Sequence, residues 1–394
     1  MANPVVCAIA RTPIGRFSGV FSPLTAMQLG SVAITGALDR SGLDPAHVDE
    51  VLFGHVLQAG QGQITSRQAA VGAGLPMTVP STTINKVCLS GMSAIGTAAA
   101  NIRLGESTFV VAGGMESMTS APYVLPGARQ GLRMGDATLI DVLTHDGLWC
   151  AFDHCIMGES SDRRNAVLGI DRASQDEWSA ESHRRAAEAT ATGAFADEIV
   201  AVSVPSRKGD PVTVTTDEGI RSGTTIETLA SLRPAFSADG TVTAGNASQV
   251  SDGAAALVMA DRSAAEAAGL PILAEILSYG QVAGPDATLH ERPAEAIRIA
   301  LKKAELAPSD LDLVEINEAF AAVALWSAAM LDLPAAKVNA GGGAVALGHP
   351  LGATGARITV TLINALRRRG GGIGAAGLCG GGGQGDALVV RVAA

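Results

Sequence analysis

Short apolar segments alternate with longer amphipathic ones along the first hundred residues. The short segments are rich in β-branched residues and end at Gly, Pro or charge, so we predict strands at 5–10, 48–56, 82–87 and 108–112. The longer segments have helical spacing and many small residues, which predicts helices at 25–41 and 91–104. Continuous apolar strands between helices indicate an α/β fold whose sheet is covered on both faces.

The second half of the chain repeats features of the first. Segment 43–51 resembles 306–314, and segment 111–113 resembles 375–377 at nearly the same separation. We therefore predict a duplicated β/α unit, although Ala-rich α/β proteins can share such short strings by chance.

A different kind of sequence separates the two halves. From residue 118 to about 249 the chain is richer in charge and turn residues, with one clear helix at 174–190 and a polar strand pair around 202–214. Residues 253–260 then return to apolar strand sequence. We interpret the intervening region as a large insertion lying over the first half.

Composition and charge narrow the class of protein. The chain has 394 residues, of which 47 % are hydrophobic but only 3 % aromatic, so Ala, Val, Ile and Leu must build the core. Its net charge of −10 is unlike that of a nucleic-acid binder, which is basic overall. The same negative charge disfavours adsorption to anionic membranes. Five cysteines, an odd number in a large chain, argue against a disulfide scaffold. With no membrane span or signal peptide recognisable, we expect a cytoplasmic protein.

Glycine is in excess, with 47 residues concentrated near the C-terminus. Glycine weakens helices and strands, so a chain keeps it where the backbone must pass close to a ligand or to another segment. Two glycine-rich segments, 341–355 and 377–385, are therefore places to look for chemistry.

Two cysteines lie at the ends of apolar runs. Cys88 precedes a predicted helix, where N–H groups and the helix dipole favour a thiolate, and a buried structural cysteine is the alternative. Cys379 precedes four consecutive glycines, whose unshielded N–H groups could bind an oxyanion, unless they form only a flexible tight turn.

Two other polar residues have comparable surroundings. Asn317 follows a predicted strand, at the edge where α/β sheets bind ligands, although a helix cap explains it equally well. His349 lies among glycines, and the rival interpretation, a dinucleotide-binding loop, lacks a clean G-x-G-x-x-G after a strand. Two thiols, a histidine and an asparagine together are the groups that thiol-based acyl transfer requires.

These segments resemble the thiolase family, of the acetyl-CoA acetyltransferase or 3-ketoacyl-CoA thiolase type. The match covers essentially the whole chain, and the Gly-His-Pro and Cys-Gly-Gly-Gly segments are its most specific parts. The resemblance implies two βαβαβαββ halves in an α/β/α/β/α arrangement. It places the N-terminal half at 1–118 plus 250–270, a loop domain at 119–249 and the C-terminal half at 271–394.

The resemblance also implies roles for the candidate residues. Cys88 resembles the nucleophile, and His349 the group that takes its proton and later holds the thioester oxygen together with a water on Asn317. The N–H groups of Cys88 and Gly381 would hold the acyl-enzyme oxygen. Cys379 would be the acid and base at the α-carbon, and both thiols would need a lowered pKa.

The implied reaction is the reversible condensation of two acetyl-CoA to acetoacetyl-CoA and coenzyme A, with no permanently bound cofactor and no metal. Arg221 would lie near the adenine and Ser248 on the pantetheine. The residues expected to line the tunnel are Leu148, Met157, Phe236, Ala319 and Phe320. Residues 126–141 resemble a tetramerisation loop, which implies a homotetramer built as a dimer of dimers.

Two departures from the short-chain pattern border the acyl pocket. Ile156 stands where a histidine is usual, and residues 289–292 replace a Met-Gly run before Pro293. A degradative 3-ketoacyl-CoA thiolase of fatty-acid β-oxidation is therefore the alternative function. A catalytically silent acyl-CoA binder and a cysteine hydrolase are weaker alternatives, since neither needs all four candidate residues.

Overall fold

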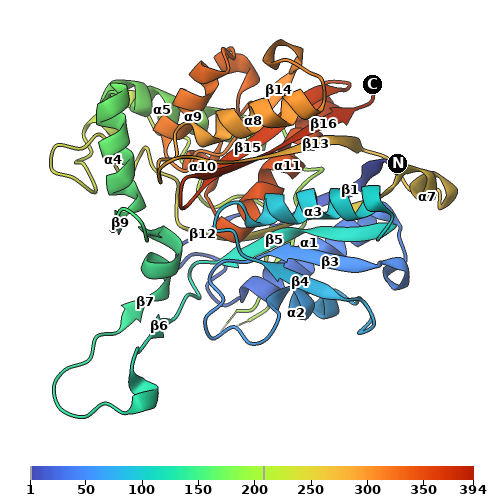
Figure 1. Ribbon diagram of the computed structural model, residues 1–394, viewed down its shortest axis with the longest axis horizontal. Coiled ribbons are helices and arrows are strands. Elements are labelled where there is room, and N and C mark those ends of the chain that lie inside the picture. The colour runs from blue at the N-terminus through green and yellow to red at the C-terminus, as the bar shows by residue number, and fades with distance from the viewer. Residues whose placement is uncertain (1, 207–208) are drawn as a thin grey trace.

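The computed structural model describes residues 2–206 and 209–394, and a long mixed β-sheet runs through its centre (Figure 1). Nine strands follow one another in the order β14-β15-β16-β13-β1-β12-β5-β3-β4. From the first half of the chain come β1 (Pro4–Arg11), β3 (Glu50–Gly54), β4 (Ser81–Ile84), β5 (Phe109–Ser117) and β12 (Ser251–Asp261). From the second half come β13 (Ala274–Ala283), β14 (Leu313–Ile316), β15 (Gly372–Gly380) and β16 (Gln384–Val392). A short strand β2 (Gly15–Arg16) pairs with β12.

The two halves have the same topology. Outward from the centre, β1, β12, β5 and β3 correspond to β13, β16, β15 and β14. In both halves the first two pairings are antiparallel and the last is parallel. The repeated segments also match, because each forms a 3₁₀ turn that leads into β3 or β14. The predicted duplication is therefore confirmed.

Helices cover the outer faces of the sheet and also form a layer between its two halves. The helices of the two halves are α1 (Ala26–Ser41), α2 (Thr65–Gly72), α3 (Ser90–Leu104), α7 (Arg262–Ala267), α8 (Arg292–Lys303), α9 (Ala321–Met330), α10 (Ala344–Leu347) and α11 (Leu351–Arg368). Helices α3 and α11 pack against each other and against strands of both halves. Helix α1 covers the outer face of the first half, and α8 that of the second. This is the expected α/β/α/β/α layering.

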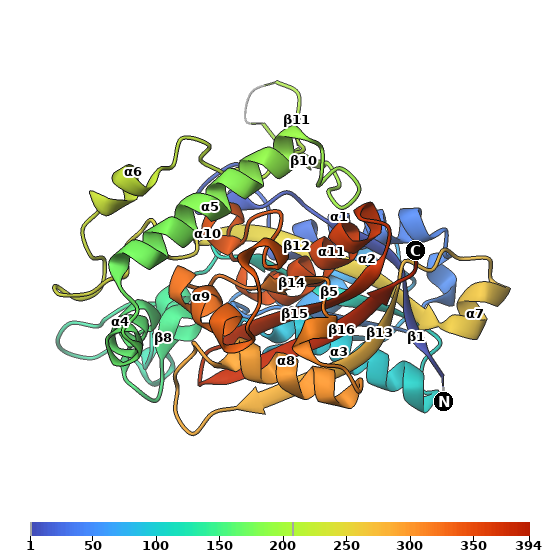
Figure 2. The same cartoon turned by 90° about the horizontal axis from the view of Figure 1, so that it is seen from above.

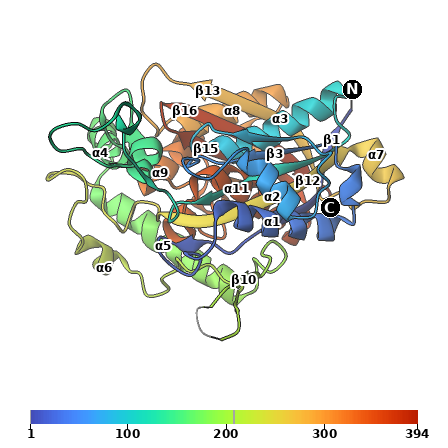
Figure 3. The ribbon, with the colours of Figure 1, turned by 90° about the horizontal axis from the view of Figure 1, so that it is seen from below.

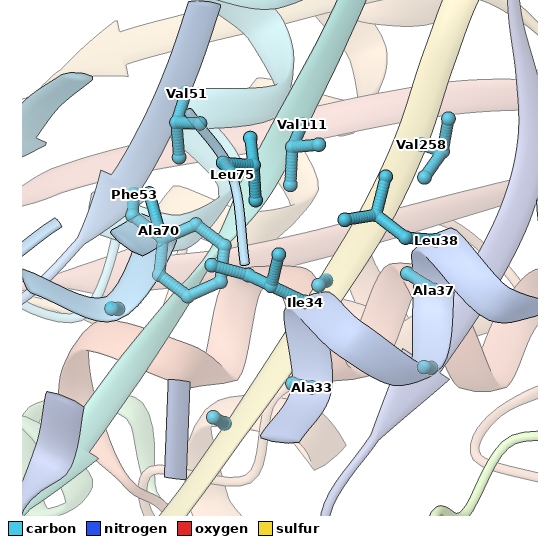
Figure 4. Close-up of a cluster of buried hydrophobic side chains, with 14 of the residues drawn as sticks. Ala33, Ile34, Ala37, Leu38, Val51, Phe53, Ala70, Leu75, Val111 and Val258 are labelled. Carbon is cyan, nitrogen blue, oxygen red and sulfur yellow. The ribbon is translucent and has the colours of Figure 1, made fainter. Parts of the chain in front are cut away.

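Apolar side chains fill the spaces between these layers. The cluster under α1 includes Ile34 and Leu38 of the helix and Val51, Val111 and Val258 of the sheet (Figure 4). The middle layer contains mainly Ala, Val, Ile and Leu from α3, α11 and both halves of the sheet. The expectation of a core without many rings is confirmed.

The insertion follows β5 and returns at β12. Its helices are α4 (Met157–Leu168), α5 (Arg172–Ala191) and α6 (Ile226–Ala230), and α5 crosses the molecule on one side (Figure 2). Its short strand pairs are β6 (Tyr123–Val124) with β7 (Ile140–Asp141), β8 (Trp149–Cys150) with β9 (Cys155–Ile156), and β10 (Val202–Val204) with β11 (Val212–Val214). The predicted helix and polar strand pair are both present. Helix α5 packs against α9 and α10 of the second half, and Figure 3 shows it from below.

Local sequence sets where the predicted elements begin and end. Thr25 caps α1 in a reciprocal arrangement with Gln28, and Gly42 ends the helix with φ of 72°. The strand expected at 82–87 ends earlier, at Ile84, because Asn85 Oδ1 accepts the Val87 N–H and the chain turns there. In the part of the chain that the structure describes, no helix is long and apolar enough to cross a membrane.

Three glycines allow the two middle helices to approach the sheet and each other. A Cβ built on Gly114 of β5 would lie 2.0 Å from the carbonyl oxygen of Gly352, the second residue of α11. A Cβ on Gly54 of β3 or Gly91 of α3 would lie 2.6 Å or 2.8 Å from the same oxygen. Real Cβ atoms do not come this close to a carbonyl oxygen. Side chains at these positions would therefore push α11 away from β3, β5 and α3.

We predict that Gly114→Ala lowers the free energy of unfolding by about 3 kcal/mol or prevents folding, because backbone on both sides would have to move. Chemical denaturation monitored by circular dichroism measures this. Gly223→Ala is the matched control, since nothing lies within 4 Å of a Cβ there. Equal stability of the two variants would contradict the proposed close contact.

Candidate active site

Cys88 lies in a tight turn between β4 and α3. The Lys86 N–H donates to Ser90 Oγ (2.8 Å), which ties the turn to the first residue of the helix. Val87 has φ of 50°, an uncommon backbone conformation for a β-branched residue. Such strain persists where the surrounding structure enforces it, and here it directly precedes the half-buried Cys88.

Residues from distant segments line one small cavity with Cys88. Its volume is about 60 Å³. The residues expected from the sequence that line it are Cys88, Leu148, Met157, Ser248, Ala319, Phe320, His349, Cys379 and Gly381. Sequence reasoning did not single out the others, which are Val87, Gly147, Leu351 and Gly380, while Leu289 was noted only as a departure. The turn before α3, the turn before α11 and the β15–β16 hairpin thus meet at one point.

His349 has a defined orientation and proton position. Its Nδ1 lies 2.6 Å from Thr354 Oγ1, and that hydroxyl donates to the Pro350 carbonyl (2.9 Å). A hydroxyl has only one hydrogen, so it must accept a hydrogen bond from His349, which places the imidazole proton on Nδ1. The lone pair is then on Nε2, which is 3.5 Å from Asn317 Nδ2. This is the form of histidine that can take up a proton.

Asn317 is fully buried beside this imidazole. Its N–H donates to the Gly377 carbonyl (3.0 Å), and its side-chain Oδ1 is among the buried polar atoms without a hydrogen-bond partner in the described part of the chain. A buried unpaired oxygen is costly, so its persistence suggests a functional purpose.

Glu318 fixes the Asn317 segment against the glycine-rich loop. Its buried carboxylate accepts hydrogen bonds from Trp178 Nε1 (2.9 Å), Ser182 Oγ (2.8 Å), Asn339 Nδ2 (3.0 Å) and the Val345 N–H (3.0 Å). These donors come from α5 of the insertion and from both sides of the loop that leads to His349. The sequence showed Glu318 beside Asn317 but gave no sign of its partners.

A second buried carboxylate, that of Glu116 in β5, connects segments of the first half. It accepts hydrogen bonds from the N–H groups of Val56 (3.1 Å), Leu57 (3.2 Å) and Gly352 (2.9 Å). The last of these bonds connects β5 to the start of α11, directly after His349. Neither Glu116 nor Thr354 was identified from the sequence. The partners of Glu116 lie far away along the chain, whereas Thr354 is only five residues from His349 and its role depends on how the turn folds.

Burial dominates the ionisation of the two thiols. It raises the pKa of Cys88 to about 12, although the N–H groups of Cys88 itself and of Gly381 act in the opposite direction. Burial and the nearby Cys88 raise the pKa of Cys379. The lowered thiol pKa values expected from the sequence are therefore wrong, because desolvation outweighs the N–H donors. Burial, assisted by Arg357, also lowers the pKa of His349 to about 3.

Two of the expected coenzyme A residues lie outside this cavity. Arg221 lines a neighbouring cavity of about 300 Å³, where its N–H donates to His183 Nδ1 (3.1 Å). Phe236 packs edge-to-face on Phe320, with ring centroids 6.4 Å apart. Ser248 remains in the small cavity, and its N–H donates to the Ala319 carbonyl (3.1 Å).

The two departures from the short-chain pattern have different positions. Leu289 lines the cavity, whereas Ile156 lies in β9, directly before the lining residue Met157. His290 next to Leu289 is fully buried, and its Nε2 lies 2.8 Å from Asn165 Oδ1 of α4. Among the described residues, no group of three or more His, Cys, Asp or Glu side chains is arranged to hold a metal ion.

Two thiols, a neutral imidazole and backbone N–H donors around one cavity are the groups of a thiol-dependent acyltransferase. The chain belongs to the thiolase family. Residues 4–263 match the model of the thiolase N-terminal domain, and residues 270–392 match that of the thiolase C-terminal domain. It is accordingly an acyltransferase.

Similar proteins cover the chain over its full length. A probable acetyl-CoA acetyltransferase of Mycolicibacterium smegmatis is 51 % identical over 98 % of this chain and 100 % of its own. An acetyl-CoA acetyltransferase of Pseudomonas aeruginosa is 48 % identical over 99 % of both chains. The crystal structure of the Bacillus anthracis acetyl-CoA acetyltransferase superposes with a TM-score of 0.96 at 43 % identity, covering 100 % of this chain and 99 % of that one.

We predict that Thr354→Val lowers kcat by about 10- to 100-fold, because the imidazole loses the partner that fixes its proton on Nδ1. Thr354→Ser keeps the hydroxyl and is expected to retain most of the activity. Steady-state kinetics over a range of pH tests this, since a wrongly protonated histidine also changes the pH profile. Equal kcat values and pH profiles for the valine and serine variants would exclude the assignment.

Proposed function

We propose that this thiolase is an acetyl-CoA C-acetyltransferase. It condenses two acetyl-CoA to acetoacetyl-CoA and coenzyme A, and it catalyses the reverse thiolysis. The observation that carries the proposal is the convergence of Cys88, His349, Cys379 and Gly381 on one cavity of about 60 Å³. The names of the similar proteins support it.

The first half of the reaction transfers an acetyl group to Cys88. The sulphur attacks the thioester carbonyl of acetyl-CoA while His349 Nε2 takes and keeps the thiol proton, and Cys379 gives its own proton to the coenzyme A thiolate that leaves. The N–H groups of Cys88 and Gly381 stabilise the negative oxygen of the intermediate. Proton transfer during the attack avoids a free thiolate, in agreement with the raised pKa of Cys88.

The second half forms the carbon–carbon bond. Cys379, now a thiolate, removes a proton from the α-carbon of a second acetyl-CoA, and the resulting carbanion attacks the acetylated Cys88. The protonated Nε2 of His349 and a water bound by Asn317 hold the enolate oxygen, a role that suits the unpaired Oδ1 of Asn317. Cleavage of the bond to Cys88 sulphur releases acetoacetyl-CoA, and the Cys88 thiolate takes the proton back from His349, so that both thiols and the imidazole return to their starting forms.

Coenzyme A enters as part of the substrates rather than as a resident cofactor. We assign Ser248 to the pantetheine and Arg221, in the adjacent cavity, to the adenine end. Leu148, Met157, Phe236, Ala319 and Phe320 form the apolar surroundings of the chain between them. The acidic protein can then bind an anionic substrate through a few local groups.

The division of the chain and its assembly are also proposals. We assign the N-terminal half to 1–118 plus 250–270, the loop domain to 119–249 and the C-terminal half to 271–394. We also propose that the protein is a cytoplasmic homotetramer.

The β6–β7 arm extends away from the body and exposes apolar side chains, among them Leu132 and Met134, which suits an interface between subunits (Figure 1). Light scattering measures the mass of the assembly.

We predict that Cys88→Ala abolishes both acetylation of the protein and thiolysis of acetoacetyl-CoA. Cys379→Ala is expected to accept one acetyl group from acetyl-CoA, because water can protonate the released coenzyme A, but to lose at least about 100-fold in condensation, because the α-carbon base is removed. Mass spectrometry of the intact protein and a coupled assay measure the two steps separately. An acetylated Cys88→Ala protein, or a fully active Cys379→Ala enzyme, would refute the assignment.

The degradative thiolase of β-oxidation remains the second candidate, because Leu289 and Ile156 depart from the short-chain pattern. The small cavity favours the short-chain enzyme. We predict that kcat/KM for thiolysis is highest for the four-carbon acetoacetyl-CoA and falls with each added pair of carbons. A rate series over 3-ketoacyl-CoA lengths measures this, and a flat or rising series would favour the degradative function.

A further inference from the structure

Two cysteines that the proposed reaction does not use face each other in the wall of the site. Strands β8 and β9 form a small antiparallel hairpin in which Cys150 is the register partner of Cys155. Both side chains are buried, with 2 % of each residue exposed. The turn between them, residues 151–154, is exposed at each position. We refer to residues 149–156 as the cysteine hairpin.

The geometry of an antiparallel pair suits a disulfide bond. Directly opposite residues have Cα atoms about 4.5–5.5 Å apart, and disulfides span roughly 4.4–6.8 Å between Cα atoms. The two sulphurs also influence each other electrostatically, since Cys150 contributes to the raised pKa of Cys155. In addition, the Asp153 N–H in the exposed turn donates to Cys150 Sγ at 3.3 Å, so the turn contacts that sulphur directly.

The cysteine hairpin is connected to the active site at three points. Leu148 precedes it and Met157 follows it, and both line the cavity around Cys88. The exposed ring of Phe152 lies over the glycine turn next to Gly381, where a Cβ on Gly382 would be 3.1 Å from its edge. The position of the hairpin therefore affects the shape of the cavity.

We propose that Cys150 and Cys155 form a reversible disulfide when the protein meets a peroxide. The Cys150 sulphur attacks the peroxide oxygen, which gives a sulfenic acid and, from hydrogen peroxide, water. The Cys155 sulphur then displaces the hydroxyl as a second water, and the S–S bond forms. One peroxide is reduced and two thiols are oxidised, and an external dithiol reverses the change.

The disulfide changes which substrates the site accepts, a consequence that rests on the proposed function. Leu148 and Met157 line a cavity of about 60 Å³, so we expect a longer acyl chain to enter only if they move, and the crosslink restrains the hairpin between them. We expect the oxidised protein to discriminate against a six-carbon 3-ketoacyl-CoA, relative to acetoacetyl-CoA, roughly threefold more strongly than the reduced protein.

The sequence allows a direct test of the crosslink. Trypsin cleaves after Arg133 and Arg163 but not between them, so one peptide contains both cysteines and no other. After treatment with hydrogen peroxide and then an alkylating reagent, this peptide should be unalkylated and lighter by two hydrogen atoms. Dithiothreitol should restore two alkylation sites. Cys88 lies in a separate tryptic peptide, 87–103, so its own oxidation is recorded independently.

Single variants test the order of attack. In Cys155→Ser, dimedone should trap a sulfenic acid on Cys150, whereas in Cys150→Ser it should trap none on Cys155. Cys7→Ala is the matched control, because Cys7 is a buried thiol in β1 and its loss should leave the crosslink unchanged. Alkylation of both cysteines after peroxide treatment, over-oxidation without an S–S bond, or a crosslink to peptide 87–103 would overturn the proposal.

The substrate effect is measured on the same samples. The ratio of kcat/KM values for the four- and six-carbon substrates should rise on oxidation in the wild type but not in Cys155→Ser treated alike. An unchanged ratio despite a mapped disulfide would refute the effect on specificity. Failure of the proposed function would instead appear as no thiolysis of either substrate by the reduced protein, while the peptide map would still report the disulfide.

Discussion

The close approach of three backbone segments to the Gly352 carbonyl is the constraint on which the site depends. Gly54, Gly91 and Gly114 leave no room for a Cβ against this oxygen, so β3, α3 and β5 all pack directly on the start of α11. Cys88 lies just before α3 and His349 just before α11. If side chains separated these segments, the nucleophile and its base would move apart, because each lies only three residues before the contact, at Gly91 for Cys88 and at Gly352 for His349.

Burial is the second determinant of the chemistry. The same packing that brings the thiols and the imidazole together removes them from water, which raises the pKa of Cys88 and Cys379 and lowers that of His349. Both members of the nucleophile–base pair are therefore neutral near pH 7. Charge has to develop during the reaction, and the N–H groups of Cys88 and Gly381 are already placed to receive it. In a low-dielectric site, such fixed donors contribute more than they would in water.

The layered fold and the four catalytic candidates were predictable from the sequence because their signals are local. Strand and helix periodicity, the Thr25 cap and the glycine runs each depend on neighbouring residues. Glu318 and Glu116 gave no such signal, since their importance arises from partners that only folding brings near. Thr354 is only five residues from His349, but its role depends on the hydrogen bonds that the folded turn makes. The thiol pKa values were wrong for a related reason. A helix start favours a thiolate locally, but the burial that opposes it is a property of the whole fold.

The acyl end of the cavity illustrates how such distant contacts bear on specificity. Leu289 lines the cavity, and the next residue, His290, is buried against Asn165, which itself donates to Gln175 Oε1 and Thr241 Oγ1. Arg164 pairs with Glu291 on the other side of the same segment. Displacing Leu289 to admit a longer chain would strain these buried polar contacts, and a buried polar group that loses its partner costs about 1–3 kcal/mol. The cysteine hairpin holds two other lining residues, Leu148 and Met157. The lining is thus fixed by contacts outside the cavity, which favours short acyl groups even though Leu289 and Ile156 depart from the usual short-chain residues.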